Sequence, residues 1–137
     1  MAFIAKSGRM KEIWLPVTPS TALAKNSIVA FSSGKLIAAT SSTAAVDHVG
    51  IIERAIASTD SDYASDRLVA IKVPTERHCL FEADVTATLV VTDVGAEVDL
   101  TDASTVNRGA GSVDAVKIIK FISTTKALVW IKFNGAY

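Results

Sequence analysis

The chain has 137 residues, half of them hydrophobic and a fifth charged, with 14 basic and 14 acidic side chains. This length suits one domain, and the composition excludes a disordered chain. A formal net charge of zero removes the long-range field that draws proteins to nucleic acid or anionic membranes, so we expect neither as a partner.

The first fourteen residues differ from the rest of the chain. Lys6, Arg9 and Lys11 precede any acidic residue, and several large apolar side chains lie among them. We predict an extended N-terminal arm over residues 1–14 and a single β domain over residues 15–137. The alternative is a frayed terminus or an ordinary first strand that folds onto its own domain. The arm residues predicted to contact a partner are Phe3, Ile4, Met10, Ile13 and Trp14.

Short runs rich in β-branched residues, separated by turn residues, predict strands along most of the remaining chain. In chain order these strands cover residues 27–31, 36–40, 49–53, 68–73, 78–83, 86–91, 98–100, 116–122 and 127–133. The first two form a hairpin around Gly34, which supplies the positive φ of a tight turn. Pro74 ends the fourth strand because it cannot donate a ladder hydrogen bond. The polar stretch 101–112 predicts a long loop.

The last predicted strand shows the two-residue alternation most clearly. One of its faces is apolar and is predicted to lie in the core; its residues are Ala127, Val129, Ile131 and Phe133. No segment of ten or more residues has a helical period, and we find no long internal repeat. The sequence therefore predicts an all-β fold, a small antiparallel β-sandwich or barrel with an extended N-terminal arm.

The sequence signatures of common enzymes are absent. There is no phosphate-binding loop, dinucleotide-binding turn, nucleophile elbow or zinc-protease motif, so we predict that the chain is not an enzyme and holds no cofactor. Cys79 is the only cysteine, which excludes an intrachain disulfide and a cysteine-rich zinc site. His48 lies far from His78 in sequence, and His78 and Cys79 are strand neighbours that point to opposite faces. We therefore expect no metal or thiol–histidine site.

An acidic loop is the one candidate for a hard cation. It contains Asp60, Asp62 and Asp66, but the glycine and glutamate that a calcium-binding EF-hand requires are replaced by Ser65 and Ile71. Aspartates in turns commonly bond to their own backbone, and we expect that here.

The outward face of the last strand offers another candidate. Trp130 lies between Lys126 and Lys132 on that face, an arrangement that can stack a base and contact phosphates. The zero net charge argues against nucleic acid, and we assign Trp130 to a protein contact.

Charge is unevenly placed along the C-terminal half. Acidic residues dominate from Asp84 to Asp114, whereas lysines dominate from Lys117 to Lys132. Opposite potentials of this kind favour head-to-tail contacts between copies. The alternative is that both regions are solvated surfaces.

Four segments of the chain resemble stretches of a known protein family. They are Thr59-Asp60-Ser61-Asp62-Tyr63-Ala64, Phe81-Glu82-Ala83-Asp84-Val85, Asp93-Val94-Gly95-Ala96-Glu97-Val98-Asp99-Leu100-Thr101 and Phe121-Ile122-Ser123-Thr124-Thr125-Lys126-Ala127. Together they are similar to the decoration, or cement, proteins of tailed-bacteriophage heads. The resemblance covers roughly residues 45–137 and is weakest over the first forty.

The resemblance implies a function in the virion. It implies an all-β protein, made in the host cytoplasm, that binds the outer surface of an assembled capsid and stabilises it. Its partners would be the major capsid protein and further copies of itself, as a homotrimer. The alternatives are another virion component, such as a head-tail connector or tail protein, or a β module that binds single-stranded nucleic acid or carbohydrate. The N-terminus lacks a signal h-region and no run approaches the length of a membrane span, so we expect no secretion.

Overall fold

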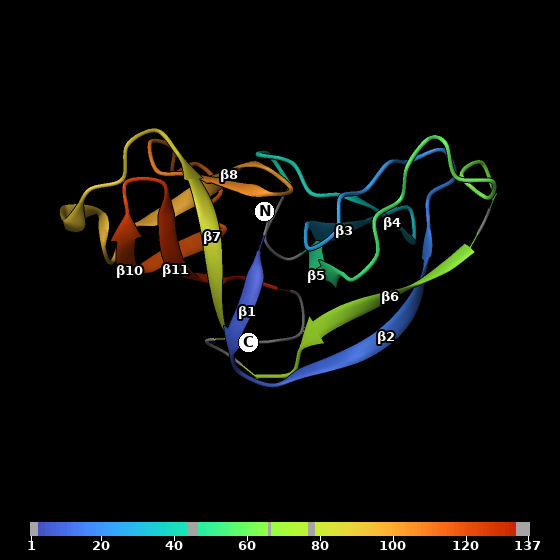
Figure 1. Cartoon of the computed structure of the whole chain (residues 1–137), viewed down its shortest axis with the longest axis horizontal. Coiled ribbons are helices and arrows are strands. Elements are labelled where there is room, and N and C mark those ends of the chain that lie inside the picture. Colours follow the sequence, from blue (N-terminus) through green and yellow to red (C-terminus); the bar gives the residue numbers. More distant parts are fainter. Residues whose placement is uncertain (1–2, 44–46, 66, 77–78, 134–137) are drawn as a thin grey trace.

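The computed structural model describes residues 3–43, 47–65, 67–76 and 79–133, which form eleven strands and a short 3-10 helix. The fold is all-β, as the sequence predicted. Figure 1 shows two bodies of strands side by side, the C-terminal one on the left and the N-terminal one on the right.

The first body is a closed five-stranded barrel with the strand order β2-β4-β3-β5-β6. Its strands are β2 (Met10–Val17), β3 (Ile28–Ser32), β4 (Lys35–Ala38), β5 (His48–Ile52) and β6 (Arg67–Pro74). β2 pairs antiparallel with β6 along its whole length, and it pairs parallel with β4 only at Val17 and Leu36. We call this body the first barrel.

The second body also closes on itself. Its strands are β7 (Leu80–Thr86), β8 (Glu97–Asp102), β9 (Thr105–Asn107), β10 (Val116–Ser123) and β11 (Lys126–Ile131). They follow the order β7-β11-β10-β8-β9, and a parallel pairing of β7 with β9 completes the ring. We call it the second barrel. β1 (Ile4–Ser7) adds to it as an edge strand, antiparallel to β7.

The two barrels have the same topology. Replacing β2 to β6 by β7 to β11, in chain order, turns one strand order into the other. We align them residue by residue on the buried pair of each parallel pairing, which is Val17 opposite Leu36 in the first barrel and Val85 opposite Val106 in the second. We find no long sequence repeat that matches this shared topology, since both barrels need only apolar residues on inward faces and tolerate many choices there.

The alternation of apolar residues explains both interiors. In the first barrel the inward side chains form one core cluster: Val17, Leu23, Val29, Leu36, Val49, Ile52, Ile56, Val69 and Ile71. The core cluster of the second barrel continues across the joint, where it includes Ile28, Ala30 and Ile51 from the first barrel and Phe3 from the N-terminal segment. The outer face of β3 is therefore buried against the second barrel, and the two barrels share a core.

Residues 3–14 do not extend from the body as the predicted arm. Phe3 is buried, and its N–H donates to Asn26 O at 3.0 Å. β1 then completes the sheet of the second barrel and β2 closes the first. The alternative considered above, a strand folded onto its own domain, describes this segment.

Two other boundaries differ from the prediction. The strand predicted over residues 86–91 is wrong, because Thr86 is the last residue of β7, residues 87–90 are not a strand, and a 3-10 helix, η2 (Val91–Asp93), comes next. The predicted long loop 101–112 contains the strand β9. This strand has only three residues, which is too short for an alternating pattern to be recognised in the sequence. Buried Asp99 holds the rest of that loop, because its carboxylate accepts N–H bonds at 2.7–2.9 Å from Ser112, Val113 and Asp114.

Candidate partner-binding site

The described residues hold no group of three or more His, Cys, Asp or Glu side chains that could bind a metal ion. Cys79 is buried against the β1–β2 turn, 3.5 Å from the carbonyl oxygen of Arg9. Burial raises the pKa of its thiol, the charge of Glu76 raises it further, and a backbone hydrogen bond at Glu76 opposes both with the smallest effect. His78 lies outside the described residues. Cys79 is thus an unreactive core side chain in its present setting.

Arginine side chains pair with the described carboxylates of the acidic loop. Asp62 forms ion pairs with Arg67 and with Arg54, and Asp60 lies 3.9 Å from Arg54. Asp60 also accepts the Ala57 N–H at 3.0 Å, which is the local backbone bond expected from the sequence. Asp66 lies outside the described residues. The two described carboxylates are therefore committed to internal partners.

His48 is fully buried at the joint between the barrels. Its Nδ1 lies 3.2 Å from Lys132 O, and its ring contacts that of Phe133 edge-on, with centroids 6.5 Å apart. A carbonyl only accepts, so Nδ1 carries the proton, and Nε2 has no hydrogen-bond partner among the described residues. Burial lowers the pKa of His48 to about 4, against a smaller opposing effect of Asp47. His48 is a neutral structural group at neutral pH.

The outer face of β2 and β6 is apolar and exposed. Trp14 lies opposite Ala70, and Pro16 lies opposite Leu68. Strand alternation places these four side chains on one surface, because their neighbours Leu15, Val17 and Val69 face the core. Trp14 is 59% exposed and Leu68 is 58% exposed. We call the surface of Trp14, Pro16, Leu68 and Ala70 the Trp14 face.

Charged groups border the Trp14 face at one end. Glu12 lies opposite Lys72, and Lys72 Nζ is 3.7 Å from a carboxylate oxygen of Glu53. Burial raises the pKa of Glu53, and the nearby Glu12 carboxyl raises it further, against the opposing effect of Lys72. The border is therefore a compact group of two acids and one base beside an apolar surface.

The corresponding surface of the second barrel is charged. The register places Glu82 and Asp84 where the first barrel has Trp14 and Pro16, and Lys126 where it has Leu68. Lys126 Nζ lies 2.7 Å from Asp84 Oδ1, and Lys6 Nζ lies 3.5 Å from a carboxylate oxygen of Glu82. Three of the four equivalent positions in the second barrel are therefore charged, with Leu128 at the position of Ala70, whereas all four are apolar in the first barrel.

The structure does not favour a nucleic-acid site at Trp130, because the two lysines beside it on the strand are paired with acidic side chains. Trp130 is half-buried, and Lys117 Nζ lies 5.7 Å from the centroid of its ring. Lys126 is paired with Asp84 and Lys132 with Glu97, at 3.5 Å. The acidic and basic stretches that the sequence separates thus meet within one barrel. Their segregation along the chain does not require a second copy.

A second group of exposed apolar side chains lies on the β7–β8 connection and the nearby end of β10. Its members, each 42–66% exposed, are Val90, Val91, Val94 and Ile122. Gly95 N–H donates to Ile118 O, which holds this connection beside β10. The three valines lie on a connection rather than on a regular ladder, and Ile122 is the only one of the four that lies on a strand.

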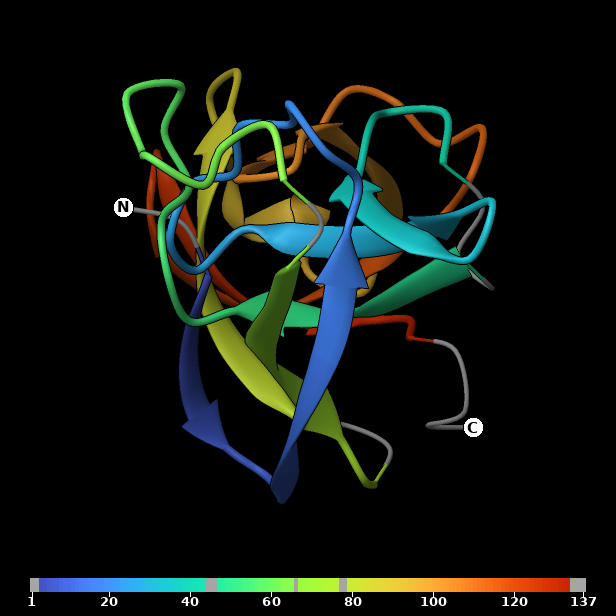
Figure 2. The ribbon, with the colours of Figure 1, turned by 90° about the vertical axis from the view of Figure 1, so that its right-hand side faces the viewer.

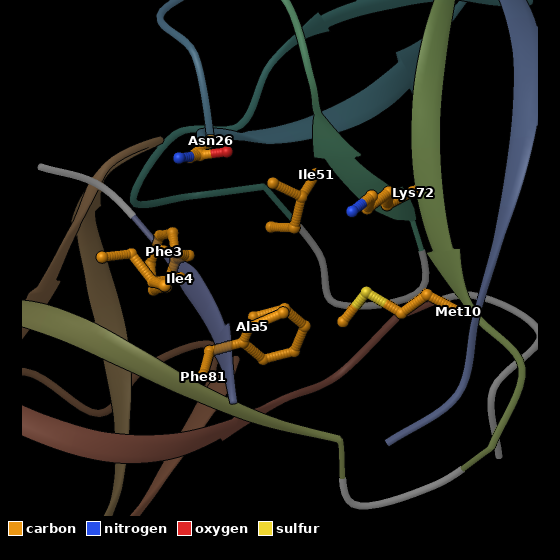
Figure 3. A pocket seen from close by; sticks show the side chains of 8 residues that line it. All are labelled: Phe3, Ile4, Ala5, Met10, Asn26, Ile51, Lys72 and Phe81. Carbon is orange, nitrogen blue, oxygen red and sulfur yellow. The ribbon is translucent and has the colours of Figure 1, made fainter. Parts of the chain in front are cut away.

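A cavity of about 230 Å³ lies at the joint between the barrels. Figure 3 shows its lining side chains: Phe3, Ile4, Ala5, Met10, Asn26, Ile51, Lys72 and Phe81. Most of this lining is apolar, and the one cation, Lys72, is already paired with Glu53.

The structure thus separates the predicted contact residues. Phe3 is buried, Ile4 and Met10 line the joint cavity, and Ile13 and Trp130 are half-buried. Trp14 alone among the six is largely exposed. The sequence analysis missed Leu68, although alternation within residues 68–73 already places Leu68 and Lys72 on the face opposite Val69 and Ile71.

Comparison with known proteins does not assign the site. No protein-family model matches the chain, and no curated protein matches it in sequence. No helix among the described residues has the length and apolar character needed to cross a membrane. The Trp14 face is therefore interpreted from its own residues.

Proposed function

We propose that this protein is a virion structural protein that binds the outer surface of an assembled bacteriophage capsid through the Trp14 face and stabilises the shell. The single observation that carries a binding function is the exposure of Trp14 and Leu68 on a regular strand ladder whose counterpart in the second barrel is charged. Exposed tryptophan on an apolar patch is typical of protein interfaces. The capsid as partner and the trimeric state are supported by the sequence resemblance alone.

The architecture suits this function. A coat protein needs a rigid body that folds before it docks, and two closed barrels with a shared core provide one. Burial of Trp14 and Leu68 on docking removes apolar surface from water, at roughly 25 cal/mol per Å² before the costs of association. Many copies on one lattice then reinforce the shell together, even if each contact is weak.

The test is co-sedimentation with empty capsids of the phage whose genome encodes the chain. We expect the wild-type protein to bind at a saturating copy number proportional to the shell lattice. Trp14→Glu should weaken binding by about tenfold or more, because tryptophan anchors of this kind contribute 2 kcal/mol or more, as a rough guide. Val91→Glu changes an equally exposed apolar residue on the second barrel and is the matched control.

The outcomes separate the parts of the proposal. Absence of wild-type binding contradicts the capsid function. Binding that Val91→Glu abolishes and Trp14→Glu leaves intact assigns docking to the β7–β8 connection instead. The molar mass of the protein in solution and on the shell tests the trimer.

A further inference from the structure

β2 has an open edge. One side of the strand pairs with β6 from Met10 to Val17, whereas the other side pairs with β4 only at Val17. Within the described parts of the chain, no strand pairs with that second side from Met10 to Leu15. Figure 2 shows β2 along the front of the first barrel, with β4 reaching only its upper end.

The backbone groups on this edge can be assigned by alternation. Thr18 N–H donates to Leu36 O of β4 at 3.0 Å, so it points to the open side of β2. Successive residues of a strand point their N–H and C=O groups to opposite sides, so Glu12 and Trp14 also point to the open side. Pro16, which has no N–H, occupies the same alternate series. A proline is tolerated there because no ladder bond is required of it.

In the second barrel a strand covers the equivalent edge. β1 pairs antiparallel with β7, with Ile4 opposite Glu82, Ala5 opposite Phe81 and Ser7 opposite Leu80. The register of the two barrels makes Glu82, Phe81 and Leu80 equivalent to Trp14, Ile13 and Glu12. The same chain therefore contains both a filled and an unfilled version of one edge.

We propose that the open edge of β2 binds an extended segment of a separate partner protein, which adds as a strand antiparallel to β2 opposite Glu12, Ile13 and Trp14. The occupant is a short peptide stretch that resembles β1 in chemistry. Its main chain bonds to the backbone of Glu12 and Trp14, and main-chain pairing of this kind gives affinity in strand addition. The occupant docks beside the Trp14 face, so the proposal rests on the partner-binding function proposed above.

The filled edge also predicts the side chains of the occupant. The residue opposite Trp14 shares the exposed outer surface with it, and an apolar or β-branched residue pairs best with tryptophan there. In β1 that position is Ile4, although it faces Glu82. The residue opposite Ile13 should be small, as Ala5 is opposite Phe81. The Trp14 face and the edge are thus two parts of one docking site.

The test uses the whole protein and a peptide with the sequence of residues 3–8, Phe-Ile-Ala-Lys-Ser-Gly, which is the chain's own occupant of the equivalent edge. Without peptide, we expect the amides of Glu12 and Trp14 to exchange with solvent at least about tenfold faster than those of Ile13 and Leu15, whose bonds go to β6. Millimolar peptide should shift and protect the Glu12 and Trp14 amides, and a scrambled peptide should not.

Two variants separate edge binding from loss of fold. Glu12→Pro removes an N–H that points to the open side, so it should keep the barrel intact and abolish the peptide effect. Lys11→Pro removes an N–H that points to β6 and should instead disrupt the barrel. Trp14→Glu copies the side chain of the second barrel, leaves every backbone group in place, and should weaken the peptide by about fivefold.

Three results would overturn the proposal. The first is a lack of peptide-induced shifts at Glu12 and Trp14. The second is a peptide effect that persists in folded Glu12→Pro. The third is a concentration-dependent dimer of the wild-type protein that Glu12→Pro abolishes, because it would assign the edge to a second copy rather than to a separate partner.

Discussion

The two barrels have the same strand order and register but opposite outer surfaces. Inside, apolar side chains occupy equivalent positions, with Val17 and Val69 of the first barrel matched by Val85 and Ala127 of the second. Outside, the pair Pro16 and Leu68 is matched by the ion pair of Asp84 and Lys126. The comparison teaches that closure of this barrel constrains only the inward residues, so the outer ladder is free to carry a function.

The barrels also differ in how their outer faces are covered. The outer face of β3 is buried in the shared core through Ile28 and Ala30. At the position equivalent to Ala30, the second barrel has Asp99, which holds its own β9–β10 loop. Ala30 thus packs in the core that the two barrels share. Asp99, at the equivalent position, bonds to a loop within the second barrel.

The largest loss of stability is expected from a substitution of Gly8, where the chain passes from the second barrel to the first. Gly8 connects β1 to β2 with a φ of +105°, and a Cβ there would lie 2.5 Å from Cys79 Sγ and 2.8 Å from its Cα. Gly8→Ala should therefore destabilise the protein by roughly 3–5 kcal/mol, combining backbone strain with a clash. Gly34→Ala is the control, because its φ is +81° with nothing within 4 Å, and it should cost only about 1 kcal/mol.

Chemical denaturation measures both glycine variants. If the barrels depend on their joint, Gly8→Ala should lower the stability of both in one transition. Two separated transitions, with the second barrel unaffected, would contradict a shared core.

Removal of the Asp99 carboxylate should weaken the second barrel. Burial acts to raise the pKa of Asp99, but the N–H groups of Asp114, Ser112 and Val113 outweigh it and lower the pKa. Asp99→Ala leaves these three donors without their acceptor and should cost roughly 2–3 kcal/mol. The stability that Asp99 contributes is present above its unfolded pKa of about 4 and is lost as the pH falls through the lower folded value.

Amide exchange tests the Asp99 prediction in a residue-specific way. Protection should fall first around Ser112 to Asp114 in Asp99→Ala, while the first barrel keeps its protection. Equal loss in both barrels would mean that Asp99 acts on the joint rather than on its loop.

A smaller effect is expected from protonation of His48. Its folded pKa of about 4 lies below its ordinary value of 6.5, so its contribution is complete above pH 6.5 and falls as the pH drops from there toward 4. The wild-type protein should lose about 2 kcal/mol between about pH 7.5 and about pH 5 from this group. His48→Gln keeps a donor for Lys132 O without titrating, and should lose less stability over the same interval. An identical pH dependence of the two proteins would exclude His48 as the cause.

The smallest effect on stability is expected when the outer ladder of the first barrel is rewritten to match the second. The double variant Pro16→Asp with Leu68→Lys copies Asp84 and Lys126 and should change the free energy of unfolding by less than about 1 kcal/mol, because exposed ion pairs contribute little. The proposed binding to capsids should nevertheless be lost. Thermal melting and co-sedimentation measure the two properties separately. A strongly destabilised variant would show that the Trp14 face supports the fold.

Several features of the fold were predictable from residues close together in sequence. The hairpin around Gly34 and the buried face of residues 127–133 were both predicted from local alternation, and both are confirmed. The prediction of a strand over residues 86–91 was wrong, because a run of apolar and β-branched residues does not reveal that β7 ends at Thr86. Val90 and Val91 are apolar yet exposed, which local propensity cannot foresee.

The candidate site was predictable only in part. Trp14 was singled out from the sequence, but on the argument of a free arm that the structure replaces with β2. Leu68 lies on the same surface as Trp14 only because β2 pairs with β6, and Pro16 and Leu68, which lie opposite each other, are about fifty residues apart in the chain. No local pattern specifies which distant strand will lie alongside.

By itself the sequence determined that the chain is all-β and which face of residues 127–133 turns inward, because a two-residue apolar period marks the buried side of a strand that has one exposed face. Only the tertiary structure decided that the strands close into two matching barrels, that the outer face of β3 is covered while the Trp14 face is not, and that β1 fills an edge which β2 leaves open. These features depend on long-range pairing, and the free energy of that pairing is a property of the assembled sheet rather than of any one segment.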